Sequence, residues 1–200
     1  MNTLALSDEI LLTIDKPARY IGNELNMVKK NPKDVDIRFA MCFPDVYEIG
    51  MSHLGIQILY DMFNKRDDVY CERVYSPWPD LHKIMKEKNI PLFALESQEP
   101  IKDFDFLGIT IQYEMCYTNI LQILDLSQIA MLSSERKEDD PIVIGGLNKE
   151  AVTIFDRTPN GTTVRMPEVD PKGMGVAGLL TSDLFGLPTT LDNETQNKLD

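Results

Sequence analysis

The sequence has few cysteines, few histidines and no long apolar run, and each scarcity excludes a class of protein. Its 200 residues include three cysteines and two histidines. Cys42, Cys71 and Cys116 stand in no C-x-x-C or C-x-x-x-C-x-x-C arrangement, which excludes a compact zinc ribbon or iron–sulfur loop. Two histidines give poor support to a histidine-based triad or metal site. No apolar run approaches the roughly 20 residues that span a bilayer.

Positive charge is also scarce. Lys and Arg together number 20 against 32 Asp and Glu, which gives a formal net charge of −12. Non-specific binding to nucleic acid or to an anionic membrane needs clustered Lys and Arg. We therefore expect no nucleic-acid partner and no membrane partner. The first residues, Met-Asn-Thr-Leu-Ala-Leu-Ser, lack the basic start and apolar core of a signal peptide, so the sequence predicts a cytoplasmic protein.

Several well-known catalytic motifs are missing as well. The sequence contains no Walker A motif, no G-x-G-x-x-G, no H-E-x-x-H and no G-x-S-x-G. Glu96, Glu99 and Glu114 stand near predicted strand ends, but nothing in the sequence pairs them as acid and base. The sequence therefore predicts no self-sufficient catalytic site.

What is present is a regular alternation of apolar strands and amphipathic helices. Strands separated by helices of about ten residues are typical of βαβ units and a parallel sheet. The pattern predicts an α/β fold with a Rossmann-like, doubly wound and mainly parallel sheet of five strands. The predicted strands are residues 36–43, 69–75, 91–95, 106–111 and 141–146, and the predicted helices are residues 51–64, 80–88 and 119–129.

The alternation suggests three segments. Residues 1–35 are predicted to form a helical lead-in, and residues 36–146 the α/β domain. In residues 147–200 the character changes: two alternating stretches surround Pro159-Asn160-Gly161, which predicts a β-hairpin. Helices at about 175–185 and 191–199 are expected to follow.

The most informative stretch is Phe-Pro-Asp-Val-Tyr-Glu-Ile-Gly-Met-Ser-His-Leu-Gly, residues 43–55. It follows the first predicted strand, and open α/β sheets bind ligands at the carboxyl ends of their strands. Within it, Asp45 can tie the loop, Tyr47 projects from it, and Gly50 allows a ligand to approach the backbone. Equally well, Asp45 can be a turn residue and Gly50 an ordinary loop glycine. Gly145 and Gly146 end the last predicted strand and suit a loop that cradles a cofactor, but a Gly-Gly pair is also common in turns.

Four strings within residues 20–146 resemble a known family: Tyr-Ile-Gly-Asn-Glu-Leu-Asn, the loop just described, Ile-Gln-Tyr-Glu-Met-Cys-Tyr-Thr-Asn, and Ile-Val-Ile-Gly-Gly. They are similar to the N-terminal region of a bacterial radical S-adenosylmethionine (radical SAM) protein family. Its members carry a cobalamin-binding-like domain ahead of the radical domain. The resemblance implies a Rossmann-like fold, with Asp45, Tyr47 and Gly50 as the loop over the cofactor and Thr110, Gly145 and Gly146 as the opposite wall.

The chain departs from that family in two respects. Cobalamin-binding domains usually carry D-x-H-x-x-G, whose His is the lower cobalt ligand, and here Tyr47 takes the position of that His. Both cobalamin bound without a protein imidazole and no cobalamin at all are open. The family's C-x-x-x-C-x-x-C loop, which binds a [4Fe–4S] cluster and S-adenosylmethionine, is absent. We therefore expect a truncated or fused product.

Three hypotheses follow. In the first, the chain is a cobalamin-binding-like module of a radical SAM protein that needs a radical SAM domain or partner protein for any chemistry. In the second, it is a cofactor-free α/β interaction module that uses the same sheet edge to contact a partner. In the third, it is a flavodoxin-like flavin binder. The third is less favoured, because flavin phosphate prefers a Ser/Thr- and Gly-rich loop where this sequence has Asp45 and Glu48.

Overall fold

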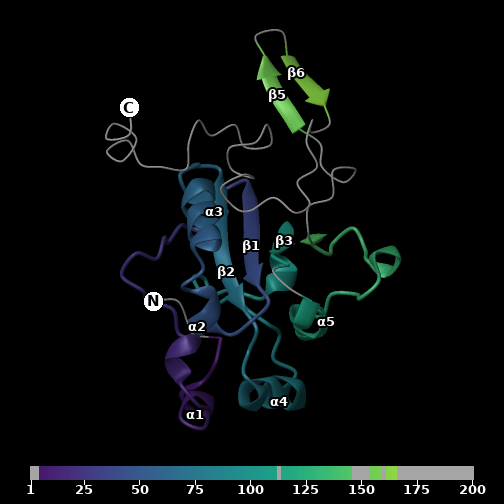
Figure 1. Ribbon diagram of the computed structural model, residues 1–200. Helices are drawn as coiled ribbons and strands as arrows, with labels where there is room; N and C mark the ends of the chain where they lie inside the picture. The colour runs from purple at the N-terminus through teal and green to yellow at the C-terminus, as the bar shows by residue number, and fades with distance from the viewer. Residues whose placement is uncertain (1–4, 112–113, 146–153, 159–160, 166–200) are drawn as a thin grey trace. The chain divides into compact units, whose positions relative to one another are not determined.

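A computed structural model describes residues 5–111, 114–145, 154–158 and 161–165. The chain divides into two compact units, residues 1–145 and residues 146–200. The first unit has the predicted α/β fold (Figure 1), with a sheet whose strands are all parallel.

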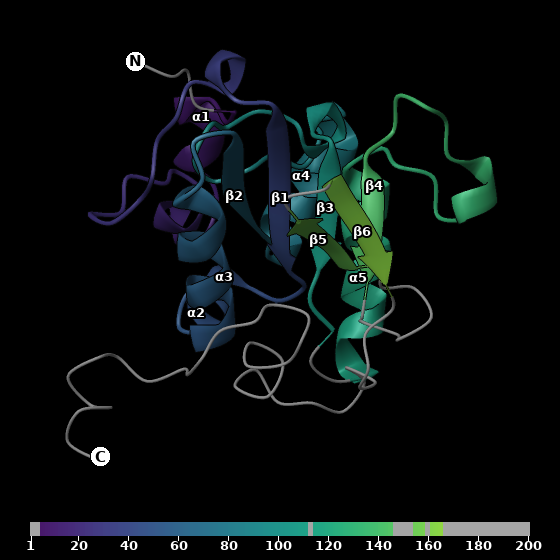
Figure 2. The same ribbon diagram turned by 90° about the horizontal axis from the view of Figure 1, so that it is seen from above.

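The sheet has four strands in the order β2-β1-β3-β4. They are β1 (Ile37–Phe43), β2 (Val69–Tyr75), β3 (Phe106–Ile109) and β4 (Ile142–Gly145). Figure 2 shows β1, β3 and β4 side by side. Met41 of β1 stands level with Arg73 of β2 and with Gly108 of β3. Because the strands are parallel, the loops that leave them begin at one edge, called here the carboxyl edge.

The helices α3 (Leu54–Asn64), α4 (Pro79–Lys88) and α5 (Tyr117–Leu126) begin and end within about three residues of their predicted bounds. Of the two shorter helices, α1 (Asp8–Leu11) lies in the predicted helical lead-in, and α2 (Tyr47–Gly50) lies where a loop was expected. Short 3₁₀ turns occupy Pro17–Arg19, Pro32–Asp34, Ile101–Asp103, Glu114–Cys116 and Ser133–Glu135. Pro79 is the first residue of α4, where a proline costs no hydrogen bond, and Asn89 ends that helix with a φ of 52°.

Alternate residues of β1 face two different apolar clusters, as expected for a strand that is buried on both sides. Ala40 and Cys42 belong to a larger cluster, which α4 and α5 also enter, for example through Leu81 and Ile123. Met41 and Phe43 belong to a smaller one with the α3 residues Ile56 and Tyr60.

The predicted fifth strand at residues 91–95 is wrong. This segment ends in a turn and makes only an isolated bridge, between Phe93 and Pro100. The reason lies at the outer edge of β2, where side chains take the hydrogen bonds that another strand would make. Asn64 accepts from the Cys71 N–H and donates to the Cys71 carbonyl, and Glu96 accepts from the Arg73 N–H. The Leu95 N–H donates to the Arg73 carbonyl at 2.9 Å and holds the segment beside the strand.

The N-terminal segment, defined here as residues 5–28, packs into the first unit. Leu6, Ile10, Ile14 and Tyr20 are buried in the larger apolar cluster. The Tyr20 hydroxyl accepts from the Trp78 N–H at 3.1 Å, and the Gln98 amide donates to the Tyr20 carbonyl at 3.1 Å. This segment therefore contributes to the core of the α/β unit.

In the second unit, β5 (Ile154–Thr158) and β6 (Gly161–Arg165) pair in antiparallel fashion, as the hairpin signal predicts. The helices expected at 175–185 and 191–199 lie outside the described residues. In the described part of the chain, no helix has the length and apolar character needed to cross a membrane.

Candidate functional site

Three of the loops that carry predicted site residues begin at neighbouring positions of the carboxyl edge. Asp45 follows β1, Thr110 follows β3, and Gly145 is the last residue of β4. Thr110 is fixed to β1, because its N–H donates to the Cys42 carbonyl at 3.0 Å. The sheet order reverses between β1 and β3, which is where open α/β sheets bind their ligands. Gly146 lies outside the described residues.

Asp45 shapes the turn that leaves β1. Its carboxylate accepts from the Val46 N–H at 2.7 Å, and its carbonyl accepts from the Ser76 N–H at 2.9 Å. The second bond ties the loop after β1 to the end of β2. Asp45 thus has the structural role of a turn residue, as the alternative interpretation of the sequence proposed.

Tyr47 makes its contacts within the chain. Its hydroxyl donates to Glu24 of the N-terminal segment, and its ring packs edge-on against Tyr75 with centroids 5.4 Å apart. Burial, followed by the neighbouring Glu24, raises the pKa of Tyr47 to about 12. A metal-binding tyrosine acts as a phenolate, and a raised pKa disfavours that form.

Gly50 is needed for packing. A Cβ atom at this position would lie 2.4 Å from Cε1 of Tyr75 and 3.1 Å from Cβ of Phe43. The space that a ligand could occupy above Gly50 is therefore filled by the ring of Tyr75. Gly145 differs, since the nearest atom to its Cβ position is Cδ1 of Ile111 at 3.6 Å, an ordinary contact distance.

A buried ionic cluster behind this loop escaped the sequence analysis. Arg73 on β2 donates from Nε to Glu96 at 2.7 Å and from Nη1 to Glu24, and its guanidinium lies 4.8 Å from the centroid of the Tyr60 ring. Arg73 and Glu96 are each 2% exposed, so their charges must compensate each other. Burial raises the pKa of Glu96 to about 7, although Arg73 opposes this shift. The available signal was Glu96 itself, an acid directly after an apolar run.

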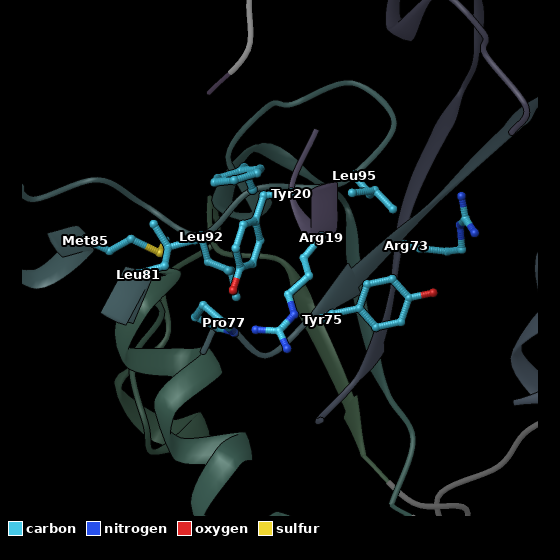
Figure 3. A pocket seen from close by; sticks show the side chains of 10 residues that line it. Arg19, Tyr20, Arg73, Tyr75, Pro77, Leu81, Met85, Leu92 and Leu95 are labelled. Carbon is cyan, nitrogen blue, oxygen red and sulfur yellow. The ribbon is translucent and has the colours of Figure 1, made fainter. Parts of the chain in front are cut away.

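The described cavities do not coincide with the predicted site. One of about 20 Å³ lies beneath the N-terminal segment, where Arg19 and Tyr20 approach from one side and Tyr75 and Arg73 from the other (Figure 3). This volume suffices for about one water molecule. An open cleft of about 390 Å³ is lined partly by Lys102, Asp125 and Asp140. It lies beyond the end of α5, away from the carboxyl edge.

Beyond the end of β3 the surface is apolar. Exposed side chains stand on the loop after β3 and on α5, which follows it along the chain; they are called here the β3–β4 surface and comprise Ile111, Met115, Tyr117 and Leu121. Met115 is 82% exposed. Exposed apolar side chains that gather on neighbouring elements are typical of a surface that contacts something else.

Comparison with known proteins supports the resemblance to radical SAM proteins. Residues 55–155 match the family described as "Radical SAM proteins, N-terminal". An uncharacterized protein of Methanocaldococcus jannaschii is 27% identical over 85 residues, which are 42% of this chain and 15% of that protein. The chain thus matches only a small part of this curated relative. No solved structure matches the chain.

Proposed function

Because the chain belongs to the family of radical SAM proteins, N-terminal, we propose that it is a module that contacts a radical SAM catalytic domain through its β3–β4 surface. The family as a whole is associated with a [4Fe–4S] cluster and S-adenosylmethionine. The motif for that cluster is missing from the sequence, and the described residues contain no group of His, Cys, Asp or Glu that could hold a metal. The chemistry would therefore belong to the contacted domain.

The exposed apolar side chains of the β3–β4 surface carry this proposal. Tyr117 and Leu121 stand one helical turn apart on α5 and are 54% and 53% exposed. Ile111 extends this surface to the end of β4, where it approaches Gly145. In contrast, the loop after β1 is held by Glu24 and Tyr75. Tyr47 and Gly50 of the loop after β1 are thus already in contact with other parts of the chain.

The test is binding to a radical SAM domain from a family member expressed without its own N-terminal region. We expect sedimentation velocity to detect a complex with the full chain. The double variant Met115→Lys and Leu121→Lys should weaken this complex at least tenfold, because each substitution places a charge in an apolar contact. The matched control is Leu25→Lys, at a fully exposed leucine of the N-terminal segment. No complex, or equal weakening by the control, would contradict the proposal.

Cobalamin at the same edge is the second candidate, and the reversal of strand order between β1 and β3 favours it. This candidate function requires a Rossmann-like, doubly wound sheet, with Thr110 and Gly145 beside the cofactor. The residues of the loop after β1 do not fit a cobalt-binding role, because Tyr47 is bonded to Glu24 and Gly50 is covered by Tyr75. Any cobalamin would then be held without a cobalt ligand from this loop.

Hydroxocobalamin and visible spectra after desalting test this candidate. If the cofactor is retained, Gly145→Trp is expected to abolish retention, because an indole side chain at the end of β4 would collide with a cofactor beside Gly145. Tyr47→Phe is expected to leave the spectrum unchanged, since its hydroxyl does not reach cobalt. The absence of a corrin band from the native chain would rule the candidate out. A spectrum altered by Tyr47→Phe would overturn our assignment of Tyr47.

A further inference from the structure

Cobalamin-binding domains usually carry a cobalt ligand at the position that the sequence comparison assigns to Tyr47. In this chain Tyr47 binds Glu24 instead. Tyr47 donates its hydroxyl to one oxygen of Glu24, and the other oxygen of Glu24 accepts from Nη1 of Arg73. Glu24 thus joins the loop after β1 to β2. Both carboxylate oxygens are used, and the partner guanidinium belongs to a residue that is 2% exposed. Charge-assisted bonds of this kind are stronger and more selective than neutral ones.

The contacts on either side of Glu24 also join the N-terminal segment to the rest of the first unit. Arg19 binds Glu48, the residue after Tyr47, with Nε 2.9 Å from both carboxylate oxygens and Nη2 2.8 Å from one of them. Further along the segment, the Val28 N–H donates to the Tyr60 hydroxyl at 2.9 Å. The N-terminal segment therefore contacts α2 and α3 through three successive polar anchors.

We propose that the loop after β1 serves as the docking site of the chain's own N-terminal segment, with Glu24 as the recognised group and Tyr47 and Arg73 as the groups that recognise it. This proposal does not depend on the proposed function, and it explains why the residues of the loop do not fit a cobalt site. The residues that dock, 5–28, lie outside the stretch that matches the family, 55–155.

A double-mutant cycle on the full chain, without cofactor or partner, tests the proposal. Tyr47→Phe, Glu24→Gln and the double variant are compared by urea unfolding. We expect the two single effects to be coupled by roughly tenfold in the unfolding equilibrium constant, because Tyr47→Phe removes the bond and Glu24→Gln removes the charge that strengthens it. The control cycle pairs Glu24→Gln with Tyr117→Phe, at an exposed tyrosine of α5, and should be additive.

Hydrogen exchange supplies a second measurement that does not depend on global stability. Both single variants are expected to speed exchange in residues 16–28 by at least threefold while the amides of β1 and β3 keep their native rates. Additive effects in the first cycle, or unchanged exchange in residues 16–28, would overturn the proposal. Since neither measurement involves a partner, this result is independent of the docking experiment.

Discussion

At the scale of single residues, the loop after β1 is determined by packing. Gly50 has no room for a side chain, because a Cβ atom would lie 2.4 Å from the Tyr75 ring. We expect Gly50→Ala to lower the free energy of unfolding by about 1–3 kcal/mol, the usual cost of overpacking. Chemical denaturation provides the measurement. Gly145→Ala is the matched control, since its nearest neighbour is 3.6 Å away, and equal losses in both variants would contradict the packing argument.

Glu48 gives a prediction about pH. Hydrogen bonds from Arg19 are the main cause that lowers the pKa of Glu48 from 4.5 to about 2. A carboxyl group with a lowered pKa in the folded state stabilises the fold above its unfolded pKa, and this contribution is lost as the pH falls through the folded value. Glu48 is 42% exposed, so we expect less than about 1 kcal/mol from the pair.

The measurement compares the native chain with Glu48→Gln in urea at a series of pH values from 7 down to 2. The native chain should be the more stable above pH 4.5, and its advantage should shrink below that value and vanish near the lowered pKa of about 2. An advantage that stays constant to pH 2 would show that ionisation of Glu48 is not involved.

At the scale of elements, the outer edge of β2 shows how side chains can satisfy the backbone hydrogen bonds of an edge strand. Asn64 makes two hydrogen bonds to the backbone of Cys71, at 2.9 and 3.0 Å. We expect Asn64→Ala to cost about 1–3 kcal/mol of unfolding free energy, because it leaves a buried N–H and carbonyl without partners. Gln57→Ala, on the same helix but with an exposed hydrogen bond, should cost less than about 0.5 kcal/mol. Thermal and urea unfolding would both report the difference.

The same edge explains what sequence patterns could and could not predict about the elements. β1, β2 and α4 follow from local apolar periodicity and end within a residue or two of their predicted bounds. Residues 91–95 have an equally strand-like pattern, but they make no ladder with β2. Which segment pairs with an edge depends on side chains outside the edge strand, here Asn64 and Glu96, and the apolar periodicity of the segment carries no information about them.

At the scale of the whole molecule, the first unit contains both apolar clusters. We therefore expect a fragment of residues 1–145 to unfold cooperatively, with a midpoint within about 3 °C of the main transition of the full chain. Differential scanning calorimetry checks this. A fragment that fails to fold, or a midpoint lower by 10 °C, would show that residues after 145 stabilise the first unit.

The sequence by itself determined the α/β class, the positions of four parallel strands and the resemblance to radical SAM proteins, because these depend on local periodicity and on contiguous strings. The tertiary structure alone decided the roles of Tyr47, Gly50 and Arg73. Their partners, Glu24, Tyr75 and Glu96, are more than 20 residues away along the chain, and a contact over such a distance leaves no local pattern. The position of Tyr47 in the loop after the first strand could be predicted from the sequence. That its hydroxyl is bonded to the chain's own N-terminal segment became evident only when the fold brought Glu24 beside it.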